Sequence, residues 1–140
     1  MEDKDKGIQK IKQAFDELLT KIFQAKDQEK QIDKVELHIF KTLVAIGKEL
    51  IMLYVESVIK GTDSNIKGEQ TVHYRNKGLF HRTYFSIFGQ IKFKRKKMYI
   101  KEEGGTIYPA DKELGISREE YSYNLQNWIG YSATDTDFRA

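Results

Sequence analysis

The sequence predicts an α+β protein with long N-terminal helices, a β-hairpin or small antiparallel sheet, and a short C-terminal helix. Three observations predict this class. Apolar residues recur every three or four positions through most of residues 8–59, as they do along one side of a helix. Residues 80–100 are instead rich in aromatic and branched side chains, which favour strands. A further, shorter helical pattern follows the single proline, Pro109.

The first helical pattern runs from Ile8 to Phe23 and is amphipathic. A polar stretch, residues 24–31, separates it from the next pattern. The sequence leaves open whether the two patterns form antiparallel helices or one continuous helix. The apolar stripe packs either within the chain or against a second copy. The candidate oligomerisation residues on it are Ile8, Ile11, Phe15, Leu18 and Ile22.

The second helical pattern covers residues 32–59 and is apolar around more of its circumference after Leu43. We therefore expect it to be the central and most buried element. Gly61 is placed to end this helix as a C-terminal cap, with a loop after it. The predicted organisation is a helical region over 1–61 and a hairpin-and-helix module over 62–140, forming either one compact unit or a helical arm plus a module.

Gly89 and Gln90 lie between the two strand-forming runs of residues 80–100. Glycine suits the first central position of a two-residue type II′ turn, because that position has a positive φ. The sequence therefore predicts a β-hairpin in which Phe88 lies opposite Ile91.

Basic residues alternate along the second predicted strand at Lys92, Lys94 and Lys96. Successive side chains of a strand point to opposite faces, so these three form a row on one face, about 7 Å apart. This spacing is close to that of phosphates along a nucleic-acid strand. In the predicted register Phe85 lies opposite Lys94.

The charge of the chain is concentrated in one segment. The net charge is only +3, but residues 67–101 carry ten Lys and Arg residues against Glu69 alone. A basic block in a nearly neutral protein indicates a polyanionic partner. The alternative is a solvated strand edge, where lysines prevent aggregation. The candidate nucleic-acid-binding residues are Arg75, Arg82, Lys92, Lys94, Arg95, Lys96, Lys97 and Lys101.

The C-terminal part contains a capping box, from Ser117 to Glu120, ahead of a helical pattern that reaches Gly130. Before it, Pro109 opens a turn or a short helical piece. Thr134 looks like the cap of a further helix, which suggests that more chain follows.

Composition excludes several classes of site. The chain has 0 cysteines, so it has no disulfide and no thiolate metal site, and its 3 histidines lack companions at ligand spacing. No catalytic constellation or phosphate-binding loop is found. The longest apolar run, residues 50–55, is too short to span a membrane, and no leader pattern is present. We expect a cytoplasmic protein with no cofactor, no metal, no membrane partner and no small-molecule substrate.

Three motifs in order carry a resemblance to a known family. They are RTYFSIFGQIKFKRKKMY from Arg82, YPADKELG from Tyr108, and YSYNLQNW from Tyr121. Their order and spacing resemble the N-terminal region of bacterial insertion-sequence transposases of the Kra type, over residues 70–140. Two departures occur: Gln90 replaces a residue that is often acidic, and the cysteine pair of many members is absent, so no zinc knuckle is expected.

The resemblance implies DNA binding without catalysis, because the metal-binding Asp, Asp and Glu of that family lie beyond this region. Asp135 and Asp137 fit better as acids at a helix start, where they complement the helix dipole. The chain would then be a truncated or split element, or an N-terminal domain used alone.

Two functions follow from these observations. The first is a DNA-binding and assembly module that contacts mostly the phosphate backbone, without sequence preference, and forms homo-oligomers through its helices. The alternative is a protein-interaction or oligomerisation module, such as a subunit or inhibitor of a transposase, that acts through the helical stripe. An independent enzyme is not expected.

Overall fold

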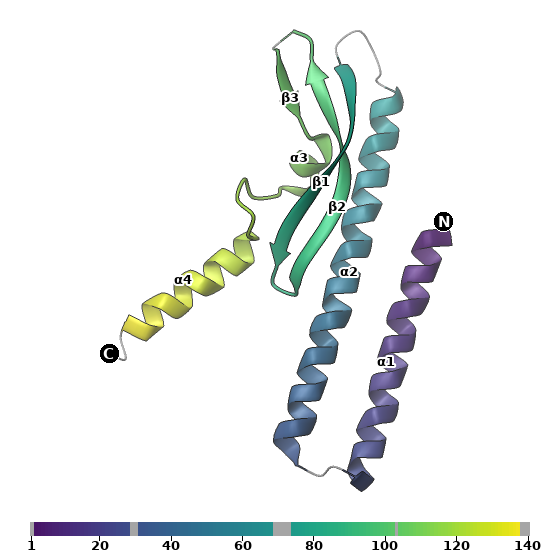
Figure 1. The fold of residues 1–140 in the computed structure, drawn as a ribbon, viewed down its shortest axis with the longest axis vertical. Helices are drawn as coiled ribbons and strands as arrows, with labels where there is room; N and C mark the ends of the chain where they lie inside the picture. The colour runs from purple at the N-terminus through teal and green to yellow at the C-terminus, as the bar shows by residue number, and fades with distance from the viewer. Residues whose placement is uncertain (1, 29–30, 69–73, 103, 138–140) are drawn as a thin grey trace. The chain divides into compact units, whose positions relative to one another are not determined.

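A computed structural model of the chain describes residues 2–28, 31–68, 74–102 and 104–137 (Figure 1). It confirms the α+β class. Two compact units divide the chain between Leu53 and Tyr54, inside the second helix, whereas the sequence placed its boundary at residue 61. The elements in chain order are α1 (Glu2–Gln28), α2 (Ile32–Gly68), β1 (Tyr74–Ser86), β2 (Gly89–Ile100), β3 (Gly105–Ile107), α3 (Pro109–Leu114) and α4 (Tyr123–Asp137).

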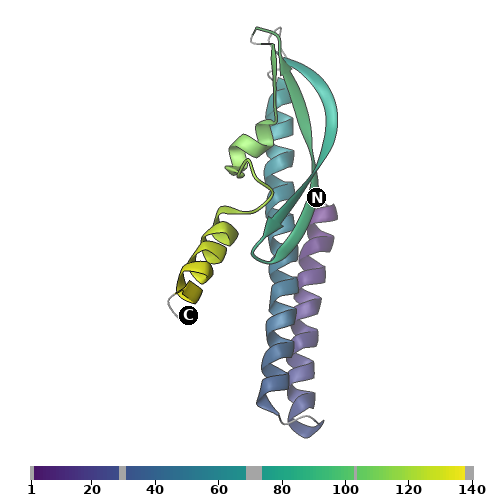
Figure 2. The same ribbon diagram turned by 60° about the vertical axis from the view of Figure 1, so that its left-hand side comes forward.

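The first unit is an antiparallel pair made of α1 and the first part of α2 (Figures 1 and 2). The two helical patterns therefore form separate helices, which the sequence had left open. Leu18 of α1 and Ile46 of α2 are buried. The ammonium of Lys10 lies 3.1 Å from a carboxylate oxygen of Glu49, which fixes which residues of the two helices lie side by side.

Helix α2 differs from the sequence prediction in its end and in its burial. It continues through Gly61 to Gly68, and Gly61 does not have the positive φ that a C-terminal cap would require. A glycine inside a helix costs only about 1 kcal/mol, which the packing of a long helix can offset. The helix is also not the most buried element, because Phe40 and Leu50 are exposed.

Strands β1 and β2 form the predicted hairpin, but with a different register. Tyr84 rather than Phe88 lies opposite Ile91, and Ser86 pairs with Gly89, so the turn is centred on residues 87–88. Gly89 has the expected positive φ of 117°. A glycine of positive φ can also stand directly after the two central residues of a turn, and Gly89 occupies that position here.

A β-bulge interrupts the hairpin near Gly78, which has a φ of 99°. The amide of Gly78 donates to the side-chain oxygen of Asn76 at 2.8 Å. Beyond the bulge, Met98 pairs with Ile107 of the third strand, so the sheet has the order β1-β2-β3. Ile91, Met98 and Ala110 are among the buried apolar residues of the second unit.

Helix α4 begins later than the capping box predicted. Its cap is Ser122, whose hydroxyl accepts from the amide of Leu125 at 3.0 Å. The hydroxyl of Ser117 instead accepts from the amide of Glu119 and from the side chain of Gln126. The predicted capping box is therefore wrong.

The predicted further helix is also wrong, since α4 continues through Thr134 to Asp137. Asp135 and Asp137 consequently lie in the last turn of α4 and not at a helix start.

Replacement of the cap should destabilise the second unit measurably. We expect Ser122→Ala to lower the free energy of unfolding by about 1 kcal/mol, because the amide of Leu125 loses its acceptor. Urea denaturation followed by circular dichroism would measure the loss. Ser57→Ala, at an exposed site in α2, is the control and should change stability by less than about 0.5 kcal/mol. Equal losses in both variants would contradict the role of Ser122.

Candidate nucleic-acid interface

The candidate interface is a row of lysines on one face of β2. Lys92 and Lys94 are exposed, while Ile91 and Phe93, which alternate with them, are buried. This is the face that strand periodicity predicted. The period of two places successive lysines about 7 Å apart along the strand. Lys96 continues the row and is half-buried.

The lysine row consists of Lys92, Lys94 and Lys96, and its partners on β1 include no acidic residue. In the observed register Thr83 lies opposite Lys92 and His81 lies opposite Lys94, where the sequence had placed Phe85. Within the described part of the chain none of the three ammonium groups forms an ion pair. The row is therefore a local concentration of positive charge open to solvent.

Arg95 lies on the other face of β2, in a buried polar cluster. Its Nε and one terminal nitrogen donate to the two carboxylate oxygens of Asp111, at 3.0 Å and 3.1 Å. Its other terminal nitrogen donates to the backbone carbonyls of Phe80 and His81, both at 3.0 Å. The guanidinium also lies 3.8 Å from the ring centre of Tyr108. All three guanidinium nitrogens of Arg95 therefore donate hydrogen bonds within the protein.

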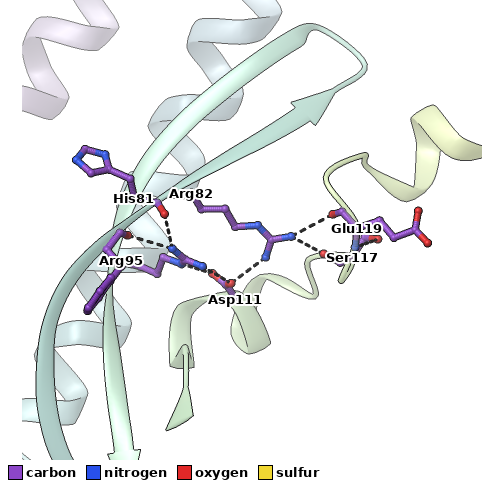
Figure 3. Close-up of polar contacts among 7 residues, drawn as sticks. His81, Arg82, Arg95, Asp111, Ser117 and Glu119 are labelled. Carbon is purple, nitrogen blue, oxygen red and sulfur yellow. Dashed lines mark hydrogen bonds and ion pairs between the residues drawn. The ribbon is translucent and has the colours of Figure 1, made fainter.

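Arg82 reaches the same carboxylate from β1. It donates to Asp111 at 2.8 Å and to the backbone carbonyls of Ser117 and Glu119. Figure 3 shows Asp111 between the two guanidinium groups, with the imidazole of His81 pointing away from the cluster. The Asp111 carboxylate thus joins both long strands to α3, and Arg82 also joins β1 to the backbone of residues 117–119. Bidentate and charge-assisted bonds of this kind are strong.

The structure therefore divides the predicted basic residues into two groups. Arg82 and Arg95 hold Asp111 and backbone carbonyls, so their positive charge is used inside the protein and they are withdrawn as candidate phosphate ligands. Asp111 itself was missed, because nothing in its local pattern distinguishes it from a helix-start acid.

Three predicted residues lie outside the lysine row. Strand alternation places Lys97 on the same face of β2 as Arg95. Lys101 is exposed in the turn after β2. Lys97 lies over the rings of Phe80 and Tyr108, at 5.0 Å and 5.9 Å from their centres. Arg75 pairs with Tyr99 in the hairpin, and its side chain lies outside the described residues.

Aromatic residues at the turn end of β1 are used in packing. Phe85 stacks on Tyr121 with ring centres 5.2 Å apart, and its backbone bonds to Glu120 and Ser122. Burial raises the pKa of Tyr84, although the charge of Arg82 opposes the change. Tyr84 and Phe85 therefore contribute to packing within the second unit.

The candidate oligomerisation residues lie mostly inside the helix pair. Leu18 is buried, and Ile8, Ile11 and Ile22 are half-buried. Phe15 alone among them is exposed, at 47%. The predicted stripe therefore mainly joins α1 to α2.

Comparison with protein-family models, with curated proteins and with solved structures finds no match for this chain. None of the described helices combines the length and apolar character needed to cross a bilayer. Among the described residues, no group of three or more His, Asp or Glu side chains is placed to hold a metal ion.

Proposed function

We propose that this chain binds DNA through the lysine row of β2, by contacts to the phosphate backbone and without sequence preference. It acts by binding, with no catalysis of its own, as the resemblance to Kra-type transposase N-terminal regions implies. Such a role belongs to the bacterial cytoplasm. One observation carries the proposal: Lys92 and Lys94 are exposed and have no ion-pair partner among the described residues, whereas Arg95 on the other face of β2 is buried and paired.

The division of the basic residues supports this assignment. Asp111 neutralises Arg82 and Arg95, whereas the lysines on the opposite face of β2 have no acidic partner among the described residues. Lysine ammonium groups bind phosphates as point charges, and contacts to phosphates carry no sequence information. Affinity should therefore depend steeply on salt, because each neutralised phosphate releases condensed counterion.

The double variant Lys92→Gln/Lys94→Gln tests the proposal. Each lost phosphate contact should lower the slope of log affinity against log salt by about 0.9, so the pair should lower it by about 1.8. At 0.1 M salt the same loss corresponds to binding weaker by about 60-fold. Fluorescence anisotropy with duplexes of several unrelated sequences, measured between about 50 and 200 mM salt, would give both quantities. Over that range of salt, two phosphate contacts change the affinity by about tenfold.

A second double variant provides the control. Lys41→Gln/Lys48→Gln removes the same charge from exposed positions of α2, so it should leave the salt slope unchanged. Equal weakening by both double variants would show a general charge effect and overturn the assignment to β2. So would a wild-type protein that leaves all duplexes unbound at low salt.

A further inference from the structure

The helix pair of the first unit exposes one apolar face. Phe15, Leu19 and Phe23 of α1 are four residues apart and follow one another along the same side of the helix. On α2, Phe40, Leu43 and Leu50 recur at intervals of three and seven and share a side in the same way. The exposed fractions of these six residues, from here on the apolar face, range from 41% to 70%.

The contacts between the helices place both rows on the same side of the pair. Leu18 and Ile46 are buried between α1 and α2. From these two residues, helical periodicity turns Lys10 and Glu49 to one side, where they form their ion pair. It turns the apolar rows of both helices to the opposite side. The six residues are therefore one continuous surface.

The two sides of the helix pair have contrasting chemistry. The side of the Lys10–Glu49 ion pair carries exposed polar residues, including Gln13 and Glu17 on α1 and His38 and Lys41 on α2. The other side presents large hydrophobic side chains. Four-helix bundles bury apolar faces of this kind in a shared core.

We propose that the apolar face is covered by the same face of a second copy, which makes the protein a homodimer. Taking about 200 Å² for a fully exposed Phe or Leu side chain, the face leaves roughly 600 Å² of apolar surface on each chain. Two copies then bury about 1,200 Å² before flanking side chains are counted, which reaches the size of specific interfaces. A face that meets itself across a two-fold axis needs no second kind of surface.

This surface differs from the predicted oligomerisation stripe, most of which is used between α1 and α2. It is also independent of the proposed DNA binding, because it consists of apolar residues and lies on other elements. High salt should weaken binding to phosphates but leave an apolar interface intact. The two proposals can therefore fail separately.

Sedimentation equilibrium of the full chain in 1 M salt (Debye length about 3 Å) tests the dimer. We expect the wild type to be dimeric and Phe40→Glu/Leu43→Glu to dissociate at least about 100-fold more readily, because carboxylates would be buried in the interface. Circular dichroism should show the same helix content in both, since these side chains are exposed within the chain.

The control is His38→Glu/Lys41→Glu, which places the same residue type on the polar side of α2 and should remain dimeric. A monomeric wild type, including one whose face binds only a different protein, would overturn the proposal. A dimer that persists in the Phe40→Glu/Leu43→Glu variant would overturn it as well. Loss of the dimer in both double variants would also overturn the proposal, because dimer formation would then not depend specifically on the apolar face.

Discussion

Asp111→Asn should lower the free energy of unfolding of the second unit by about 3–5 kcal/mol, the usual cost of removing one partner from a buried ion pair. The side chain of Asp111 is 16% exposed and that of Arg95 only 7%. Asparagine has the same shape, but it offers one oxygen and no charge to two guanidinium groups. Urea denaturation, followed by circular dichroism, would measure the loss.

The control for this variant is Glu113→Gln, which makes the same chemical change at an exposed position of the same helix, α3. It should change stability by less than about 0.5 kcal/mol. Because Asp111 is largely removed from solvent, the difference between the two variants should persist in 1 M salt, where the Debye length is about 3 Å. Similar small losses for both variants would show that Asp111 is not the joint between the strands and α3.

Strand alternation was sufficient to predict which face of β2 carries the lysines. The turn was placed two residues too far along the chain, yet an even shift leaves every side chain on its original face. Lys92 and Lys94 are therefore exposed as expected, although their partners on β1 are different. The position of the turn was ambiguous because Gly89 can provide its positive φ either within a turn or directly after one.

The roles of the arginines could not be predicted from local sequence. Arg95 and Arg82 meet Asp111 across 16 and 29 residues, through contacts that exist only once α3 packs on the sheet. In the sequence both arginines belong to the same basic block as the lysines, so charge counting treats them alike. Burial separates them, and burial depends on tertiary structure.

Helix ends were misplaced for a related reason. Ser117 is followed three residues later by Glu120 and matches the capping pattern, whereas Ser122, the actual cap, is followed by Leu125. The backbone from Glu120 to Ser122 pairs with Phe85 of β1, which prevents a helix from starting earlier. A contact distant in sequence thus overrode a favourable local signal.

Arg95→Gln should affect mainly stability and Lys94→Gln mainly DNA binding, although the two residues are neighbours in the chain. Arg95→Gln removes the bidentate bonds to Asp111 and the donors to Phe80 and His81, so it should cost about 3 kcal/mol of stability. Lys94→Gln changes an exposed side chain and should alter stability by less than about 0.5 kcal/mol.

For binding to DNA the order should reverse. Lys94→Gln should lower the salt slope by about 0.9, the value of one phosphate contact. Arg95→Gln, measured at a temperature where it remains folded, should keep the wild-type slope, because its guanidinium faces Asp111 and not solvent. Urea denaturation and anisotropy titrations on the same preparations would give both quantities. A lower slope for Arg95→Gln would mean that the arginine leaves Asp111 to contact phosphate, and the division between buried arginines and exposed lysines would then fail.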